Sequence, residues 1–214
     1  MRTYVSPIGF NSTSVTRPVL SYGVDTDDRV VVIRPEEETD DSRGEEAIAD
    51  VRRLLTEIEP AVSLSTERVP HDDFETAVLY CRDLLRAVDG ELIVNLGGGA
   101  RDVLVPFVTA VLAEQPRVDR VVLFSDIDGR VREVNLPRLT ATISDAVGET
   151  LVAINQAGGE TSIPELTEAT SRSKSTIARH VDVLESNDAL ESHREGKTKH
   201  VSLTLTGQLL VDGD

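Results

Sequence analysis

The feature that most constrains the fold is an uninterrupted apolar run, Val-Val-Val-Ile at positions 30–33, framed by Arg29 and Arg34. Its β-branched residues favour an extended strand, and the absence of alternating polar residues indicates a strand that is buried on both faces. Strands of that kind occur in parallel sheets that helices cover on both sides. The run therefore predicts an α/β protein.

The sequence around this run alternates between strand and helix patterns, as a parallel sheet requires. Each pair of consecutive strands is separated by a segment long enough for a helix, which indicates a doubly wound, mostly parallel Rossmann-like sheet. Residues 126–142 leave two alternatives open, because 131–136 could form a sixth strand in a hairpin or belong to a linker. The expected strands are 2–8, 29–34, 62–69, 91–95 and 120–125, and the expected helices are 15–22, 42–59, 73–88 and 101–114.

A few side chains carry more specific expectations. Ser14 is expected to cap the first helix. Phe74, Val78, Cys81 and Leu85 follow the spacing of a buried helix face, so we expect the single cysteine to be a core thiol without an intrachain disulfide. The acidic segment 36–41 is expected to be a solvated connector.

Ligands bind a doubly wound sheet outside the carboxyl ends of its strands, where the winding reverses, which singles out the loops after the first and fourth strands. These loops read Ser-Pro-Ile-Gly-Phe-Asn-Ser-Thr at 6–13 and Asn-Leu-Gly-Gly-Gly-Ala-Arg-Asp at 95–102. Successive glycines at the start of a helix can present main-chain N–H groups to a phosphate, which Arg101 could reinforce. Tight packing of the turn is the alternative explanation. The segment lacks the Lys-Ser/Thr pair of a P-loop and the third glycine of a dinucleotide fingerprint.

Residues 137–214 show a different organisation, with a helix expected at 143–156. Ser162 and Glu165 form a capping box for a short helix that reaches about residue 169. After a turn, Ser173 can cap a second helix, in which Ile177, Val181 and Leu184 share one buried stripe. The opposite face carries Lys174, Ser175, Thr176, Arg179 and His180.

A β-hairpin is expected after that helix, between residues 190 and 205, with a turn at Glu195-Gly196-Lys197 and with Val201, Leu203 and Leu205 alternating along its second strand. All three lysines of the chain lie between residues 174 and 199. Residues 171–200 hold six Lys or Arg and five Asp or Glu, a net charge of +1, whereas the whole chain has a net charge of −16. This local concentration of cations suits a phosphate backbone. A solvated helix face beside an ordinary hairpin is the alternative.

Residues 144–206, centred on Ser-Lys-Ser-Thr-Ile-Ala-Arg-His-Val-Asp-Val-Leu-Glu at 173–185, resemble the winged helix-turn-helix of MarR/ArsR-type regulators. The resemblance implies that the second helix enters the major groove of double-stranded DNA and that the wing contacts the flanking backbone. The DNA-binding residues it implies are Arg172, Lys174, Ser175, Thr176, Arg179, His180, Arg194, Lys197 and Lys199.

The two glycine-containing loops together resemble the CARF domain, the CRISPR-associated Rossmann-like fold, over residues 1–136. With the winged helix at 137–214, the whole chain resembles archaeal CARF and winged-helix transcription regulators. That resemblance implies a homodimer that binds a cyclic oligoadenylate, such as cyclic tetra-adenylate, across its two-fold axis. The chain departs from the family pattern at Gly97 and Ala100, where hydroxyl residues are usual. The implied ligand-binding residues are Gly9, Phe10, Asn11, Ser12, Asn95, Gly97, Gly98, Gly99, Ala100 and Arg101.

Composition adds broader expectations. Nineteen arginines against three lysines, with an isoelectric point near 4.6, resemble proteins of halophilic archaea. No apolar run could span a membrane and no signal peptide is recognisable, so we expect a cytoplasmic protein. We also expect no cofactor. The four histidines lack metal-ligand spacing. Two other functions remain open: a ring nuclease that uses Ser12, Thr13 and Arg101, and an adaptor whose winged helix binds protein.

Overall fold

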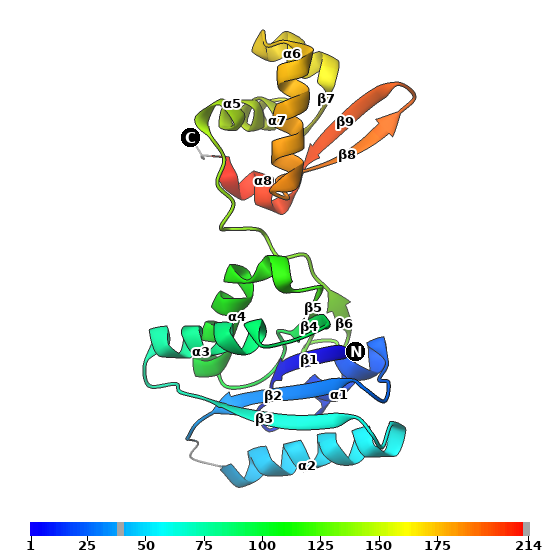
Figure 1. Ribbon diagram of the computed structural model, residues 1–214, viewed down its shortest axis with the longest axis vertical. Coiled ribbons are helices and arrows are strands. Elements are labelled where there is room, and N and C mark those ends of the chain that lie inside the picture. The colour runs from blue at the N-terminus through cyan, green and yellow to red at the C-terminus, as the bar shows by residue number, and fades with distance from the viewer. Residues whose placement is uncertain (38–40, 212–214) are drawn as a thin grey trace. The chain divides into compact units, whose positions relative to one another are not determined.

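The computed structural model describes residues 1–37 and 41–211 (Figure 1). The chain divides into two compact units, Met1–Leu136 and Pro137–Asp214. In the described ranges, no helix is long and apolar enough to cross a membrane.

The first unit contains a six-stranded sheet. Its order is β3-β2-β1-β4-β5-β6, and all neighbours are parallel except β5 and β6, which are antiparallel. The predicted doubly wound, mostly parallel sheet is confirmed, and 131–133 form the sixth strand, which resolves the alternative left open for that segment. The strands are β1 (Arg2–Pro7), β2 (Arg29–Pro35), β3 (Ser63–Val69), β4 (Glu91–Asn95), β5 (Arg120–Phe124) and β6 (Val131–Glu133).

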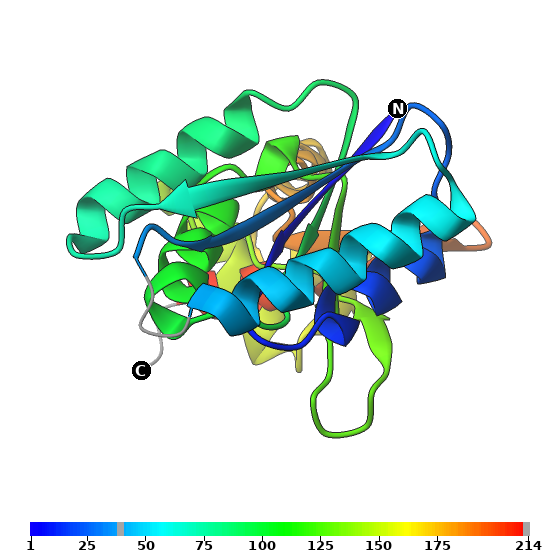
Figure 2. The same ribbon diagram turned by 90° about the horizontal axis from the view of Figure 1, so that it is seen from below.

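Helices cover both faces of this sheet (Figure 2). Val30 and Val32 of β2 join the core that α1 and α2 close, whereas Val31 and Ile33 join the core under α3 and α4. The continuous apolar run is thus buried on both faces because successive side chains point to opposite sides of the strand. The helices are α1 (Thr13–Tyr22), α2 (Asp41–Ile58), α3 (Phe74–Arg86), α4 (Arg101–Ala113) and the 3-10 turn η1 (Gln115–Arg117).

Two side-chain expectations in this unit are wrong. Ser14 does not cap α1, because the helix begins at Thr13 and the buried Ser14 hydroxyl instead donates to the carbonyl of Asn11 at 2.8 Å. Phe74 is the first residue of α3 and is 53% exposed, while Cys81 and Leu85 are fully buried as expected. Residues 38–40 of the acidic segment lie outside the described residues.

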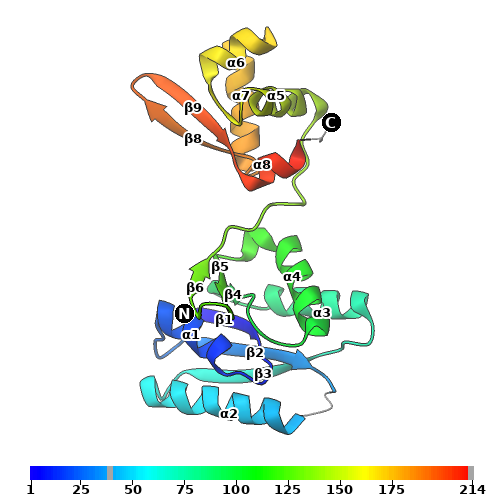
Figure 3. The same ribbon diagram turned by 180° about the vertical axis from the view of Figure 1, so that it is seen from behind.

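The second unit combines four helices of its described part with a three-stranded antiparallel sheet of order β7-β9-β8 (Figure 3). The C-terminal unit resembles a winged helix-turn-helix: α6 and α7 form the helix-turn-helix, and β8 and β9 form the wing. Its elements are α5 (Asp145–Gln156), β7 (Glu160–Ser162), α6 (Ile163–Thr170), α7 (Lys174–Ser186), β8 (Leu190–Glu195), β9 (Thr198–Leu203) and α8 (Leu205–Leu210).

Local signals set the helix starts in this unit. The Glu165 amide donates to the Ser162 hydroxyl at 3.4 Å, and the Glu165 carboxylate accepts from the Ser162 amide at 2.8 Å, which confirms the capping box. Ser173 caps α7 by accepting from the Thr176 amide at 3.2 Å. The left-handed Ser171, at φ 52°, turns the chain between α6 and α7. Short-range hydrogen bonds therefore set where α6 and α7 begin.

The end of the hairpin differs from the expectation. Leu205 does not continue β9 but begins α8, which the Thr204 hydroxyl caps by accepting from the Gly207 amide at 3.2 Å. The pattern of alternating leucines stops at Leu203 because a Thr cap competes with extended backbone there. Neither α8 nor β7 was predicted from the sequence.

Candidate ligand pocket and nucleic-acid interface

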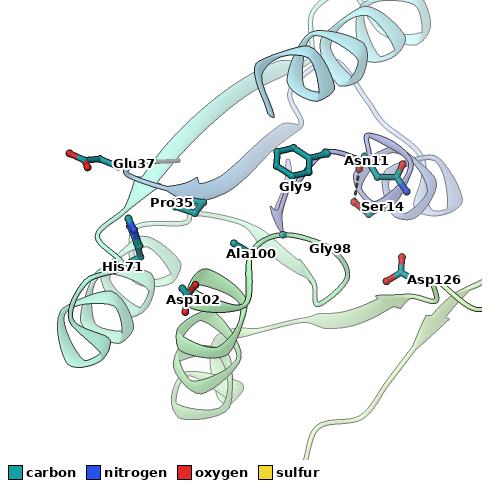
Figure 4. A pocket seen from close by; sticks show the side chains of 12 residues that line it. Gly9, Asn11, Ser14, Pro35, Glu37, His71, Gly98, Ala100, Asp102 and Asp126 are labelled. Atoms are coloured by element: carbon teal, nitrogen blue, oxygen red, sulfur yellow. Dashed lines mark hydrogen bonds between the residues drawn. The ribbon is translucent and has the colours of Figure 1, made fainter. Parts of the chain in front are cut away.

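A cavity of about 470 Å³ lies at the carboxyl ends of the parallel strands in the first unit (Figure 4). Every one of the five parallel strands contributes to it through the loop that follows the strand. Such a position is where doubly wound sheets bind ligands. The lining consists of Gly9, Phe10 and Asn11 after β1, Ser14 in α1, Pro35 at the end of β2, Glu37 after β2, His71 after β3, Gly98, Gly99 and Ala100 after β4, Asp102 in α4, and Asp126 after β5.

Six of the ten residues expected to bind ligand lie in this lining, namely Gly9, Phe10, Asn11, Gly98, Gly99 and Ala100. Ser12, Asn95, Gly97 and Arg101 lie outside it. Ser12 precedes α1, and Arg101 is exposed at the first position of α4. Neither side chain lines the cavity, but Ser12 follows the lining residue Asn11 and Arg101 lies between the lining residues Ala100 and Asp102.

Asn95 has a structural position between the two loops. Its buried side-chain amide donates to the Ser6 hydroxyl at 2.7 Å and to the Ser14 carbonyl at 2.8 Å, and its oxygen accepts from the Gly97 amide at 3.1 Å. Gly97 is buried beside Phe124, whose atoms would lie 3.0–3.1 Å from an added Cβ. These contacts join the end of β4 and the loop after it to β1, α1 and β5.

Gly98 and Gly99 serve close packing of the same two loops. Both have positive φ, at 87° and 79°. A Cβ on Gly98 would lie 2.7 Å from the Ser14 hydroxyl oxygen, and a Cβ on Gly99 would lie 2.6 Å from the Pro7 Cβ. The glycines therefore satisfy a steric requirement of the turn while their backbone also lines the cavity.

The charge of the lining is acidic. Glu37, Asp102 and Asp126 contribute carboxylates, and among the described lining residues there is no Lys or Arg. Main-chain N–H groups at the start of α4 offer partial positive charge, since Ala100 supplies no side-chain cap there. A phosphate in this cavity would depend on those groups and on cations adjacent to the lining.

His71 is the lining residue that sequence reasoning most clearly missed. Its Nδ1 is buried without a hydrogen-bond partner among the described residues, and its Nε2 lies 3.7 Å from the Asp72 carboxylate. Its position two residues after β3 could have identified it from the sequence, because the carboxyl ends of all five parallel strands meet at one edge of the sheet. The same signal identifies Glu37 after β2 and Asp126 after β5.

The N-terminal half of α7 presents the polar face expected for DNA reading. Lys174, Ser175 and Arg179 are exposed, and Thr176 is half-buried. The C-terminal half instead carries Asp182 and Glu185. This charge asymmetry along the helix favours insertion of its N-terminal half into a groove between phosphates, the orientation that recognition helices adopt.

His180 is not on that exposed face, contrary to the expectation. Only 3% of it is exposed, and its Nδ1 lies 2.7 Å from the hydroxyl of the buried Thr150 on α5. Position 180 lies three residues after Ile177 and next to Val181, so it falls on the buried stripe. Burial, followed by the charges of Arg172 and Arg179, lowers the pKa of His180.

The cations of the wing and of the turn before α7 fall into two groups. Arg194 and Lys197 are exposed near the Gly196 turn, where φ is 61°. The Lys199 ammonium donates to Glu185 at 2.8 Å, and Arg172 is paired with Glu149. Arg172 and Lys199 are thus already held in intramolecular ion pairs.

Within 1–37 and 41–211, no cluster of His, Cys, Asp or Glu could hold a metal ion.

The chain therefore combines a Rossmann-like domain, which has a pocket at its carboxyl edge, with a unit that resembles a winged helix-turn-helix. The sequence profile of the Csa3 CRISPR-associated Rossmann-like domain matches residues 2–135, and the chain belongs to that family. The CARF resemblance of the first unit is thereby confirmed. A comparison with curated proteins found no match.

Solved structures were compared with the chain as well. Enterococcus italicus Csm6, solved with cyclic hexa-2'-fluoro-hexa-dAMP, has a TM-score of 0.52 and 13% identity over 88% of this chain and 52% of its own, and it shares the fold. A mutant of E. coli MarR, solved with operator DNA, has a TM-score of 0.31 and 22% identity over 33% of this chain and 51% of its own. Bordetella bronchiseptica BpsR has the same score and identity over 33% of this chain and 55% of its own. The chain spans about half the length of these structures.

Proposed function

We propose that the protein is a ligand-responsive, DNA-binding transcriptional regulator. Its first unit would sense a cyclic oligoadenylate or a similar phosphate-bearing nucleotide, and its winged helix would bind double-stranded DNA. The observation that carries this proposal is the exposed Lys174, Ser175 and Arg179 on the first half of α7, in a chain whose other unit is a Csa3-type domain with a carboxyl-edge pocket.

On DNA, α7 would lie in the major groove with its N-terminal half toward the bases. Arg and Lys side chains can contact guanine or phosphate, and short hydroxyl side chains can contact either bases or backbone. Lys174, Ser175, Thr176 and Arg179 take these roles, with Arg194, Lys197 and Lys199 on the flanking backbone. Arg172 would join them after leaving Glu149.

In the pocket, the main-chain N–H groups of the Gly98–Ala100 segment would hold a phosphate at the start of α4. Csm6 was solved with a cyclic hexanucleotide analogue, which supports a cyclic oligoadenylate as the ligand class. A ring with two-fold symmetry suits a homodimer, because each protomer offers the same groups to half of the ring. Cyclic tetra-adenylate is the particular ligand to test first.

A homodimer also sets the form of the operator. Two recognition helices related by a two-fold axis require half-sites about 34 Å apart, or a multiple of that distance, and therefore an inverted repeat. Ligand and DNA would be coupled reciprocally, each changing the affinity for the other by the same factor.

A gel-shift assay on the region upstream of the protein's own gene tests DNA binding. Arg179→Ala should weaken retention, whereas Arg52→Ala, which removes the same charge from the exposed face of α2, should not. The assay belongs in high salt as well as low, because the composition resembles halophilic proteins and the Debye length is only about 3 Å at 1 M salt. Equal retention of the wild type and Arg179→Ala would refute the assignment.

A ring nuclease is a second candidate, and the position of His71 favours it. Ser12, Thr13 and Arg101, the side chains first expected to support cleavage, lie outside the cavity lining, but His71 lies within it. Histidine is the most frequent general acid or base in such chemistry. Incubation with cyclic tetra-adenylate and chromatography of the products tests this: linear product that disappears with His71→Ala would support cleavage, and intact ligand would exclude it.

A further inference from the structure

A phosphate-bearing ligand needs a cation that the pocket lining does not supply. The described lining carries the carboxylates of Glu37, Asp102 and Asp126 and no Lys or Arg. Main-chain N–H groups carry only partial charges. Two arginines next to the lining can supply the balancing cation: Arg101, between the lining residues Ala100 and Asp102, and Arg43 in the first turn of α2.

Arg43 occupies such a position. Its guanidinium carbon lies 4.4 Å from the centroid of the Phe10 ring, and Phe10 lines the cavity with 52% of its surface exposed. A guanidinium within about 6 Å of an aromatic face is attracted by the ring, and arginine stacks on such faces more often than lysine. The contact places a cation at the rim of the cavity, beside the loop after β1.

The start of α2 fixes the backbone from which Arg43 reaches Phe10. The Asp41 carboxylate lies 2.9 Å from Nη2 of the buried Arg34 and 3.0 Å from Nη1 of Arg68, at the ends of β2 and β3. A Cβ on Gly44 would lie 2.0 Å from Arg34, so glycine provides the space for that buried side chain. The first turn of α2 is thus attached to the carboxyl edge of the sheet, which reduces the ordering cost of using Arg43.

We propose that Phe10 and Arg43 form a clamp at the pocket rim, in which the Phe10 ring stacks on a base of the ligand and the Arg43 guanidinium pairs with its phosphate. This inference rests on the proposed nucleotide-sensing function and names a recognition residue, Arg43, beyond the two glycine-containing loops. The half-exposed ring leaves apolar surface for a base, and base stacking on aromatic side chains is a common source of nucleotide affinity. A guanidinium stacked by its face can direct its N–H edge to a phosphate in a bidentate contact.

The clamp implies a ligand that carries base and phosphate together. Inorganic phosphate would use Arg43 alone, and a nucleoside would use Phe10 alone. A cyclic or linear oligoadenylate uses both side chains at once, so the two contributions should be coupled.

Calorimetric titration of the full chain with cyclic tetra-adenylate tests the clamp. Arg43→Gln and Phe10→Leu should each weaken binding about tenfold, with Arg43→Lys in between because lysine keeps the charge without the planar fork. The fold loss of affinity in the double variant Phe10→Leu/Arg43→Gln should be smaller than the product of the two single-variant losses, since each side chain positions the other. Arg52→Gln, on the same helix and exposed, is the matched control and should bind as the wild type does.

Two results would overturn the clamp alone: wild-type affinity in Arg43→Gln, or a loss in Arg52→Gln equal to that in Arg43→Gln, which would indicate a long-range charge effect. If the wild type binds neither cyclic tetra-adenylate nor cyclic hexa-adenylate, the proposed sensing function fails and the clamp fails with it. Circular dichroism of each variant separates loss of binding from loss of folding.

Discussion

The His180 imidazole accepts or donates a 2.7 Å hydrogen bond at Nδ1 with the hydroxyl of Thr150, inside the core of the winged-helix unit. This bond joins the helix that would read DNA to α5. Thr150 is fully buried, and the pKa of His180 is lowered, first by burial and then by Arg172 and Arg179. The neutral imidazole is therefore the form compatible with the folded unit.

This pair predicts how stability depends on pH. Because the pKa of His180 is lower in the folded state than its ordinary value of 6.5, the unfolded chain takes up a proton first as the pH falls. The stability contributed by the neutral histidine is present above about pH 6.5 and declines between that value and the lowered folded pKa. The midpoint temperature of thermal unfolding should shift less between about pH 7.5 and about pH 5.5 in His180→Gln than in the wild type. Equal shifts in the two proteins would contradict this origin.

The two positive-φ glycines of the pocket should tolerate no side chain. Gly98→Ala and Gly99→Ala add a left-handed alanine and a contact below 3.0 Å, so each should lower the free energy of unfolding by about 2–4 kcal/mol. Gly129→Ala is the control, because its φ is 67° but no atom lies within 4 Å of its added Cβ. Its cost should be about 1–2 kcal/mol, from backbone strain alone. Chemical denaturation measures all three, and equal losses would argue against the steric account.

Ala100→Ser should stabilise the first unit. Ala100 has the extended backbone of an N-cap, with φ −69° and ψ 143°, but provides no side-chain hydrogen bond to α4. A serine hydroxyl there can accept from a backbone amide of the first turn, which is typically worth about 1 kcal/mol. Denaturant titration would show the gain as a higher midpoint with an unchanged slope. A lower midpoint would mean that the cavity wall cannot accept the hydroxyl.

The two lysines of the wing should contribute unequally to DNA binding. Lys197 is exposed at the hairpin turn, whereas the Lys199 ammonium lies 2.8 Å from Glu185 and 3.8 Å from Asp182. Lys197→Gln should reduce the salt dependence of affinity by about one phosphate contact, and Lys199→Gln by less. Fluorescence anisotropy across a salt series measures both slopes. A larger change for Lys199→Gln would show that DNA displaces the two carboxylates.

Sequence periodicity was sufficient for the five parallel strands, but it left the sixth strand open. Val30 to Ile33 alternate between two cores, and that burial on both faces is visible in the sequence because no polar residue interrupts the run. Short-range caps, such as Ser162 with Glu165, could also be predicted from the sequence, since both partners lie within one helical turn. Side chains near helix starts were harder to assign: Ser14 was expected to cap α1 but lies inside it, and Phe74 was expected on the buried face of α3 but is its exposed first residue.

Long-range contacts explain the remaining errors. His180 looks like a DNA-reading residue until its partner Thr150, thirty positions earlier in the chain, is brought beside it. The sequence also does not show that the Asn95 amide donates to Ser6 and Ser14, and its expected ligand contact stays a prediction. His71 joined the pocket only when the order of the strands placed the end of β3 beside the other carboxyl ends.

The most direct test of a ligand-responsive regulator is the affinity of the full chain for an inverted-repeat duplex from its upstream region, measured by fluorescence anisotropy with and without saturating cyclic tetra-adenylate. The account predicts specific binding that changes at least about fivefold on adding the ligand, the lower end of typical allosteric coupling. The same dissociation constant in both titrations, or no preference for the inverted repeat over a scrambled duplex, would contradict it.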